Sequence, residues 1–268
     1  ELNVGRVKLF LLHTNIPDND PYCLLFACAR GNCLAVGEAS TEYLFSDVAV
    51  KEIERQFPGA RYIVMVRSPV DLAFSLYKYE KAGGREVAST FEEAWRRSPE
   101  RRRGEWVGKW CSDPKWLDYQ MVASTGWQLE RLFGVVDQER VLVLILDDVK
   151  EEPSREYRKV LDFLGLKDDG RKEFQVENKG RTKKSSRVVG LVNHLGRFAK
   201  RLKRMVGIPD HKGFGLLRFM DSLNSSSSSG DAFPPSLHRE MSEYFRGDVE
   251  LTSNLLRRDL SSWGLKDS

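Results

Sequence analysis

Arg67 stands at a point in the chain where the residue types and their order favour a site for an anion. The preceding run, Tyr62 to Val66, is apolar and rich in β-branched residues, the pattern of a strand buried on both faces of a parallel sheet. Pro69 suits the first turn of a helix, and the apolar residues after it recur at helical spacing. Arg67 therefore belongs to a turn at the carboxyl edge of the predicted sheet, where its guanidinium and the free helix N–H groups could bind an anion.

By position alone, Arg67 could also be a solvated strand end or the partner of a nearby carboxylate. The wider frame R-x-P-x-x-x-x-x-S-x-Y, which ends at Tyr77, resembles the 3′-phosphate-binding segment of the sulfotransferases that use 3′-phosphoadenosine 5′-phosphosulfate (PAPS). In that family the arginine and the serine of this frame hold the 3′-phosphate, and the matching residues here are Arg67 and Ser75. A planar guanidinium suits a dianionic phosphate, and a hydroxyl adds one more short hydrogen bond.

A second motif, GEASTEYL, occupies residues 37–44. We expect a short strand at Leu34 to Val36 before it and a turn of small residues from Gly37 onward. The motif is similar to the G-E-x-S/T-x-x-Y-L stretch of bacterial and Golgi-type PAPS sulfotransferases, in several of which the glutamate is the general base; the matching residue is Glu38. A carboxylate suits this role because a hydroxyl becomes more nucleophilic when its proton is removed as the new bond forms. Alternatively, Glu38 caps a helix or forms a salt bridge.

The basic stretch from Arg171 to Arg204 holds twelve lysines and arginines against two glutamates. Within it, Lys179, Gly180 and Arg181 are similar to the K-G-R segment that closes over the 3′-phosphate in heparan-type sulfotransferases, which implies a role in cofactor binding. The stretch could instead be a solvated basic face, or a surface for an anionic polymer or a membrane. Residues 197–205 have the pattern of a basic amphipathic helix, which would allow contact with a membrane surface.

Two further segments extend the resemblance along the chain. The apolar run Val141 to Leu146 predicts a second buried strand, and residues 141–166 look like the strand and helix unit of the family. Residues 237–263 are similar to its C-terminal helix. The resemblance implies an α/β fold, a P-loop-type three-layer domain with a central parallel sheet and helices on both faces. We expect a single domain over residues 1–268, with a flexible Ser-rich link at 224–230 inside it.

One expected motif of the family is absent from this sequence. The loop P-K-x-G-T-[ST], which grips the 5′-phosphosulfate, has no match in the first 37 residues, and no G-x-x-x-x-G-K-[ST] occurs anywhere in the chain. In relatives this loop stands upstream of a segment much like residues 1–30, so we expect an N-terminally truncated chain that begins after the loop. Such a fragment would lack half of the donor site and could be inactive by itself.

The rest of the sequence narrows down neither the acceptor nor the cellular compartment to one choice. We expect residues 84–116, where tryptophans alternate with basic residues, to contribute to the acceptor pocket. Charged residues make up 31% and hydrophobic residues 41% of the chain, which is ordinary for a globular protein. The first three of the four cysteines recur at five-residue intervals, which is not a usual zinc spacing, and the cysteines read as free thiols or buried small hydrophobes or, alternatively, as a disulfide. The compartment stays open: cytoplasm for a bacterial protein, Golgi lumen for a eukaryotic one.

The resemblance thus implies a sulfotransferase that moves a sulfuryl group from PAPS, its co-substrate, to a hydroxyl or amine of a carbohydrate or lipid, with no metal and no nucleic-acid partner. The oligomeric state is left open. One alternative is a nucleotide-dependent kinase of the same architecture, which would need a Walker loop and magnesium ligands. Another is a non-catalytic protein that binds anionic polymers through residues 171–204.

Overall fold

A computed structural model of the chain describes, with their side chains, residues 34–108, 111, 113–174 and 234–264, and in addition the backbone of residues 2–4, 7–11, 181–183 and 225–227. The chain divides into two compact units, and each unit takes two separate segments of the sequence. The first unit is made of Glu1–Val66 and Gln128–Phe174, and the second of Arg67–Trp127 and Gln175–Ser268.

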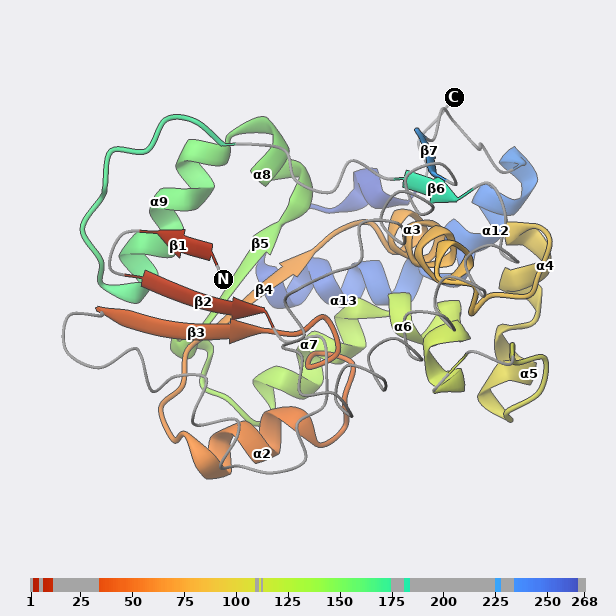
Figure 1. Ribbon diagram of the computed structural model, residues 1–268, viewed down its shortest axis with the longest axis horizontal. Helices are drawn as coiled ribbons and strands as arrows, with labels where there is room; N and C mark the ends of the chain where they lie inside the picture. The colour runs from red at the N-terminus through yellow and green to blue at the C-terminus, as the bar shows by residue number, and fades with distance from the viewer. Residues whose placement is uncertain are drawn as a thin grey trace, which may run out of the picture. The chain divides into compact units, whose positions relative to one another are not determined.

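The strands of the first unit form two sheets with parallel pairs (Figure 1). Strand β2 (Val7–Leu11) pairs in parallel with β3 (Ala35–Ala39) and antiparallel with β1 (Leu2–Val4). Strand β4 (Tyr62–Val66) pairs in parallel with β5 (Val141–Ile145). Both predicted apolar runs are thus strands, and β5 ends one residue earlier than expected because Leu146 begins a helix.

Two details of these strands differ from the expectation. Strand β3 continues through Gly37 to Ala39, so Glu38 lies in a strand and not in the turn that we predicted. On β4, Ile63 and Met65 expose 44% and 53% of their surface, so this strand is not buried on both faces. A short apolar run looks the same in sequence whether one or both of its faces are buried.

Helices and short turns connect these strands. They are α2 (Ala49–Gln56), α7 (Thr125–Phe133, which enters the first unit at Gln128), the 3₁₀ turn η3 (Gln138–Arg140), α8 (Leu146–Glu151) and α9 (Pro153–Leu164). Helix α2 is tied to the start of β4 through Glu54, which accepts hydrogen bonds from the Tyr62 hydroxyl at 2.8 Å and from Arg140. Helix α9 begins at a proline and ends at Gly165, whose φ of 69° lies in the left-handed region that glycine adopts without strain.

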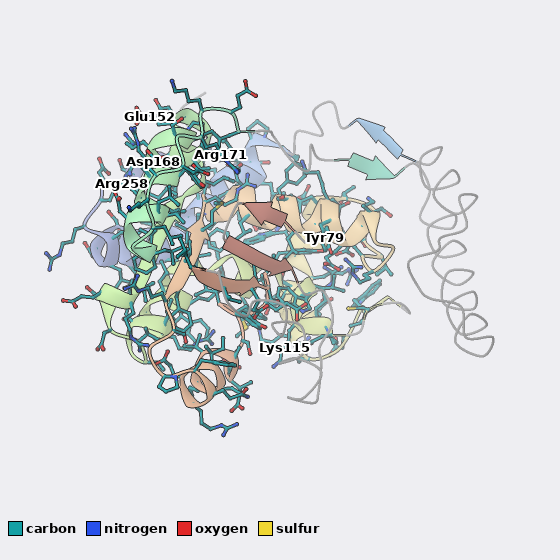
Figure 2. All side chains as sticks on the ribbon, turned by 60° about the vertical axis from the view of Figure 1, so that its left-hand side comes forward. Tyr79, Lys115, Glu152, Asp168, Arg171 and Arg258 are labelled. Atoms are coloured by element: carbon teal, nitrogen blue, oxygen red, sulfur yellow. The ribbon has the colours of Figure 1, made fainter. Side chains whose placement is uncertain are left out.

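The segment that follows α9 folds back onto that helix. The Tyr157 hydroxyl is hydrogen-bonded to Asp169 at 3.1 Å, and the guanidinium of Arg171 lies over the Tyr157 ring, 5.5 Å from its centroid. Figure 2 labels the exposed side chains Asp168 and Arg171 of this segment, together with Glu152. The start of the basic stretch is thus anchored within the first unit.

The second unit is mainly helical. Its elements are α3 (Pro69–Ala82), α4 (Phe91–Arg96), α5 (Ser98–Arg102), η2 (Pro114–Leu117), α6 (Tyr119–Ala123), β6 (Arg181–Lys183), β7 (Ser225–Ser227), α12 (Pro235–Tyr244), α13 (Arg246–Leu256) and η4 (Ser261–Trp263). Aromatic rings fill its core: Phe91 lies 5.4 Å from Tyr77 and 6.3 Å from Tyr119, centroid to centroid, and Trp95 lies 5.5 Å from Phe245. These contacts hold α3, α4, α6 and the C-terminal helices together.

A buried ion pair lies beside these rings. The Arg101 guanidinium donates to Glu86 at 2.5 Å, and neither side chain is exposed. The Tyr119 hydroxyl donates to the other oxygen of Glu86 at 2.5 Å, and burial raises the pKa of Tyr119 well above its usual range. Arg101 also bonds the carbonyls of Ala94 and Leu117, so one side chain joins three segments of this unit.

The Ser-rich segment differs in part from the expected flexible link. Three of its residues, Ser225–Ser227, form β7 and pair antiparallel with β6, with Ser227 opposite Arg181. Backbone hydrogen bonding requires no particular side chain, so a run of serines can extend a ladder when a partner strand is available.

The start of α7 packs against α13 within the second unit. The Asp248 carboxylate accepts hydrogen bonds from the backbone N–H groups of Gly126 and Trp127, each at 3.0 Å. A Cβ atom on Gly126 would lie 2.4 Å from the carbonyl oxygen of Asp248 and 2.6 Å from Thr252 Oγ1. A glycine inside this helix is therefore explained by the close approach of α13.

Candidate functional site

Arg67 and Ser68 connect β4 to α3, as the strand, turn and helix pattern predicts. The Arg67 side chain is 26% exposed, and its Nη2 lies 3.6 Å from the carboxylate of Asp71, one helical turn further on. Its Nε is buried and has no hydrogen-bond partner in the part of the chain that the structure describes. A buried donor without a partner is costly unless something bonds it, so this guanidinium has capacity for an anionic ligand.

Ser75 lies on α3, on the same helical face as Asp71, because residues four apart are neighbours on a helix. The residue is partly buried. Arg67 precedes this helix and Ser75 lies about two helical turns further on, whereas Ser68, at the N-cap, provides no side-chain cap. The first N–H groups of a helix have no intrahelical partner, and they favour negative charge. A guanidinium, a hydroxyl and such N–H groups are donors that suit a phosphate, and binding of one phosphate by Arg67 and Ser75 together stays a prediction.

Glu38 lies on β3 in the first unit, opposite Phe10 of β2. Its carboxylate is hydrogen-bonded to the Tyr43 hydroxyl, and Oε2 is buried without a partner among the described residues. Burial raises the pKa of Glu38 above its ordinary value of 4.5, and the Tyr43 hydrogen bond opposes this effect in part. A carboxylate with a raised pKa and one free oxygen is suited to accept a proton.

The other expected positions fall partly or wholly outside the described residues. Lys179 and Gly180 lie outside them, as do residues 197–205, and of Arg181 only the backbone is described, in β6. Glu38 belongs to the first unit, whereas Arg67 and Ser75 belong to the second. The roles assigned to all of these residues stay predictions.

The region expected to bind the acceptor carries one unusual residue, Trp106. Its φ of 53° is rare for a bulky side chain, and it is 52% exposed. The Arg97 guanidinium lies over the indole ring, 3.4 Å from its centroid. Cys111, in the same region, is a free thiol.

Two contacts at these sites were missed by sequence reasoning. For Arg67 the sequence allowed a carboxylate partner without naming it, and the spacing of four residues, which places charged side chains side by side, could have identified Asp71. The contact of Tyr43 with Glu38 carried no signal, although both residues stand in the GEASTEYL motif. Within the described ranges no cluster of three His, Cys, Asp or Glu residues could hold a metal, and no helix is long and apolar enough to cross a membrane.

Known proteins with similar sequences show which family this chain belongs to. The family described as sulfotransferase domain matches residues 48–187, more than half of the chain, and this range contains Arg67 and Ser75 but not Glu38. The bifunctional heparan sulfate N-deacetylase/N-sulfotransferase 1 of Xenopus laevis is 27% identical over 132 residues. That match covers 48% of this chain, and the chain spans only 14% of the length of this relative.

A solved structure extends the likeness to the fold. The crystal structure of a sulfotransferase from Alicyclobacillus acidocaldarius has a TM-score of 0.63 and 27% sequence identity, and the match covers 92% of this chain and 74% of that one. With the parallel strand pairs, this likeness confirms the expected α/β fold of the P-loop type. The family generally uses PAPS. The chain belongs to the sulfotransferase domain family.

Proposed function

We propose that this chain transfers a sulfuryl group from PAPS to a hydroxyl or amine of an acceptor. The observation that carries the proposal is a hydrogen-bond donor without a partner just before α3. Arg67 Nε is buried without a partner in the described structure, and Ser75 follows on the same helical segment. The family generally uses PAPS, which supports the 3′-phosphate of that nucleotide as the ligand of Arg67.

In this proposal Arg67 and Ser75 hold the 3′-phosphate, with the first N–H groups of α3 behind them. Lys179, Gly180 and Arg181 close over the same phosphate. Because a guanidinium offers two parallel donors, it fixes the orientation of the phosphate as well as its position. The nucleotide is thereby held so that its sulfuryl group faces the acceptor.

Glu38 acts as the general base. As the acceptor oxygen or nitrogen attacks sulfur, its proton passes to Oε2 of Glu38. The new bond to sulfur forms while the bond between sulfur and the phosphate oxygen of the donor breaks. Adenosine 3′,5′-bisphosphate leaves with the bonding electron pair. Glu38 is suited to this step because Oε2 is buried and unpartnered among the described side chains, and burial raises its pKa.

A carbohydrate is the acceptor that we propose first, with a lipid second. The support is the similarity to the Xenopus relative, a heparan sulfate N-deacetylase/N-sulfotransferase. The family match also favours sulfuryl transfer over phosphoryl transfer by a kinase of similar architecture. The uneven charge of residues 171–204 supports a second candidate function, binding of an anionic polymer, and this could occur with or without catalysis.

The test is calorimetric binding of adenosine 3′,5′-bisphosphate beside adenosine 5′-phosphate, which lacks the 3′-phosphate. We expect a clear preference for the bisphosphate. Arg67→Ala should reduce that preference by about tenfold to a hundredfold, since hydrogen bonds to a charged group contribute roughly 1.5 to 3 kcal/mol. Ser75→Ala should have the smaller effect of about twofold to tenfold.

Arg61→Ala is the matched control. Arg61 stands at the other end of β4, where its guanidinium donates to the Phe163 carbonyl at 2.5 Å, and it should not affect the preference. If Arg67→Ala binds both nucleotides as the unchanged protein does, the assignment of Arg67 is wrong. Polymer binding by residues 171–204 predicts the reverse pattern, an affinity for heparin that falls steeply with salt and does not depend on Arg67.

A further inference from the structure

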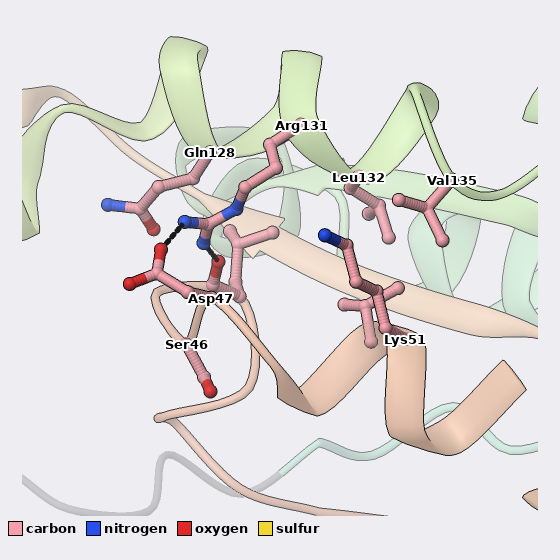
Figure 3. A pocket seen from close by; sticks show the side chains of 9 residues that line it. Ser46, Asp47, Lys51, Gln128, Arg131, Leu132 and Val135 are labelled. Atoms are coloured by element: carbon pink, nitrogen blue, oxygen red, sulfur yellow. Dashed lines mark hydrogen bonds and ion pairs between the residues drawn. The ribbon is translucent and has the colours of Figure 1, made fainter. Parts of the chain in front are cut away.

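The turn that follows Glu38 is held in place by a side chain from a distant part of the first unit. Arg131 on α7 donates through Nη2 to the carbonyl oxygens of Leu44 at 2.6 Å and Phe45 at 2.9 Å. Its Nη1 donates to the carboxylate of Asp47 (Figure 3). The Arg131 side chain is 22% exposed, whereas that of Asp47 is 64% exposed. One guanidinium therefore bonds three residues of the segment between β3 and α2.

Bonds within the turn also order the backbone around Tyr43. The Glu42 N–H donates to Ser40 Oγ at 3.3 Å, and the Ser46 N–H donates to the Glu42 carbonyl at 3.0 Å. The second bond spans residues 42–46 and so encloses Tyr43, and Arg131 adds bonds from α7 to two carbonyls of the same turn. Leu44 and Phe45, which Arg131 bonds, directly follow Tyr43 in the sequence.

A small pocket surrounds these contacts. It is lined by Ser46, Asp47 and Lys51 from the side of α2 and by Gln128, Arg131, Leu132 and Val135 from the side of α7, and also by Leu44 and Val50 (Figure 3). In the close-up, Arg131 reaches from its helix toward Asp47 and the turn, whereas Lys51 points toward Leu132 and Val135. Among the residues drawn there, Arg131 is the charged donor that reaches the turn.

We propose that Arg131 is a positioning residue for Glu38: it fixes the turn that keeps the Tyr43 hydroxyl on one carboxylate oxygen and leaves Oε2 free to take the proton of the acceptor. The inference rests on the proposed role of Glu38 as the base. Since Oε2 has no partner among the described residues, the Tyr43 hydroxyl bonds the other oxygen. A carboxylate held by one oxygen has a defined orientation, and orientation of the reacting group accounts for a large part of catalysis.

The consequence can be read from the titration of Glu38. Burial and the Tyr43 hydroxyl are the two influences on its pKa in the described part of the chain, and the hydroxyl lowers the pKa. If Arg131 holds Tyr43 in place, loss of Arg131 removes this hydrogen bond, and the pKa of Glu38 rises further. A role of Arg131 in stability alone would leave the pKa where it is.

The experiment is a carbon-13 NMR titration of the whole chain, labelled at the glutamate carboxyl carbons, with the Glu38 signal assigned from its loss in Glu38→Gln. We expect Tyr43→Phe and Arg131→Gln each to move the Glu38 midpoint to higher pH. The double variant should titrate as Tyr43→Phe does, because both changes remove the same hydrogen bond. Arg140→Gln is the control: Arg140 also bonds a carboxylate, Glu54, and a carbonyl, Ala60, but not the turn.

Two results would overturn the inference. In the first, the titration midpoint of Glu38 is unchanged in a folded Arg131→Gln variant. Arg131 would then only stabilise the fold. The other is a double variant whose shift is the sum of the single shifts, since Arg131 would then act by a route other than Tyr43. If Arg131→Gln does not fold, Arg131→Lys keeps the charge beside Asp47 but loses the fork that bonds the carbonyls, and it should move the midpoint in the same direction.

The titration needs neither PAPS nor an acceptor substrate. Its result is therefore independent of whether the test of the proposed function succeeds. Calorimetric binding of adenosine 3′,5′-bisphosphate to the same variants completes the design. We expect Arg131→Gln to bind the nucleotide as the unchanged protein does, because Arg131 is proposed to act on Glu38 and not on Arg67. Weaker binding by this variant would contradict a role confined to the base.

Discussion

The guanidinium of Arg67 lies 3.6 Å from the carboxylate of Asp71, one helical turn further along the chain. Asp71 is 47% exposed, so water and salt screen its charge. A phosphate bound to Arg67 would meet this negative charge on the same face of α3. The contact is therefore one that a bound anion would weaken or replace.

We expect Asp71→Asn to bind adenosine 3′,5′-bisphosphate more tightly. An exposed charge pair contributes about 0.2 to 1 kcal/mol, so the gain should be no more than roughly fivefold. It should shrink as salt is raised, which calorimetry at two ionic strengths measures. Weaker binding by Asp71→Asn would show instead that Asp71 holds Arg67 in its binding orientation.

The proposed base predicts a pH dependence of catalysis. Glu38 must be ionised to accept a proton, and burial raises its pKa above 4.5. The value of kcat/KM should therefore rise with pH through this raised pKa, and protonation of Glu38 should abolish transfer below it. The measurement is transfer from PAPS to fully desulfated, N-acetylated heparan sulfate, which offers hydroxyls and no free amine.

Glu38→Gln should lower kcat/KM by about 10²- to 10⁴-fold and remove this acidic limb. A limb that persists in Glu38→Gln would assign the base to another group. Absence of transfer by the unchanged protein would speak against this acceptor and would leave Glu38 to be tested by its titration.

Gly126 is expected to resist substitution. A Cβ atom there would lie 2.4 Å from the backbone oxygen of Asp248, so Gly126→Ala must displace α13 or α7. Overpacking of this kind costs about 1 to 3 kcal/mol. The midpoint of urea denaturation should fall accordingly.

Gly247→Ala is the control for this substitution. A Cβ atom on Gly247 would have no other atom within 4 Å, and Gly247 lies within a helix. Alanine is favoured over glycine in helices by up to about 1 kcal/mol, so stability should stay equal or increase. Equal effects of the two substitutions would contradict the packing of α7 on α13.

The buried pair of Arg101 and Glu86 should dominate the stability of the second unit. Glu86→Gln would leave the Arg101 charge buried without a counter-ion, which costs about 3 to 5 kcal/mol. Tyr119→Phe removes one hydrogen bond to Glu86, and the cost should be about 0.5 to 3 kcal/mol. Urea denaturation measures both, and a milder effect of Glu86→Gln than of Tyr119→Phe would contradict this ranking.

The sequence by itself determined those features that depend on near neighbours in the chain. The apolar run at 62–66, the proline at 69 and the eight-residue spacing of Arg67 and Ser75 are local, and the structure has the strand, the turn and the helix that they predict. Arg67 lies just before α3 and Ser75 lies on it, so one strand, turn and helix set their separation. Glu38 could be picked out by its motif, although its strand was taken for a turn.

Only the tertiary structure decided which groups in the described part of the chain remain without partners. Arg131 reaches carbonyls more than 80 residues away along the chain, and Gly126 is required because Asp248 comes close to it. Whether Arg67 Nε and Glu38 Oε2 are buried, and whether anything bonds them, depends on side chains that pack from other elements. Burial and hydrogen bonding are sums over spatial neighbours, and a linear pattern of residue types does not specify which neighbours those are.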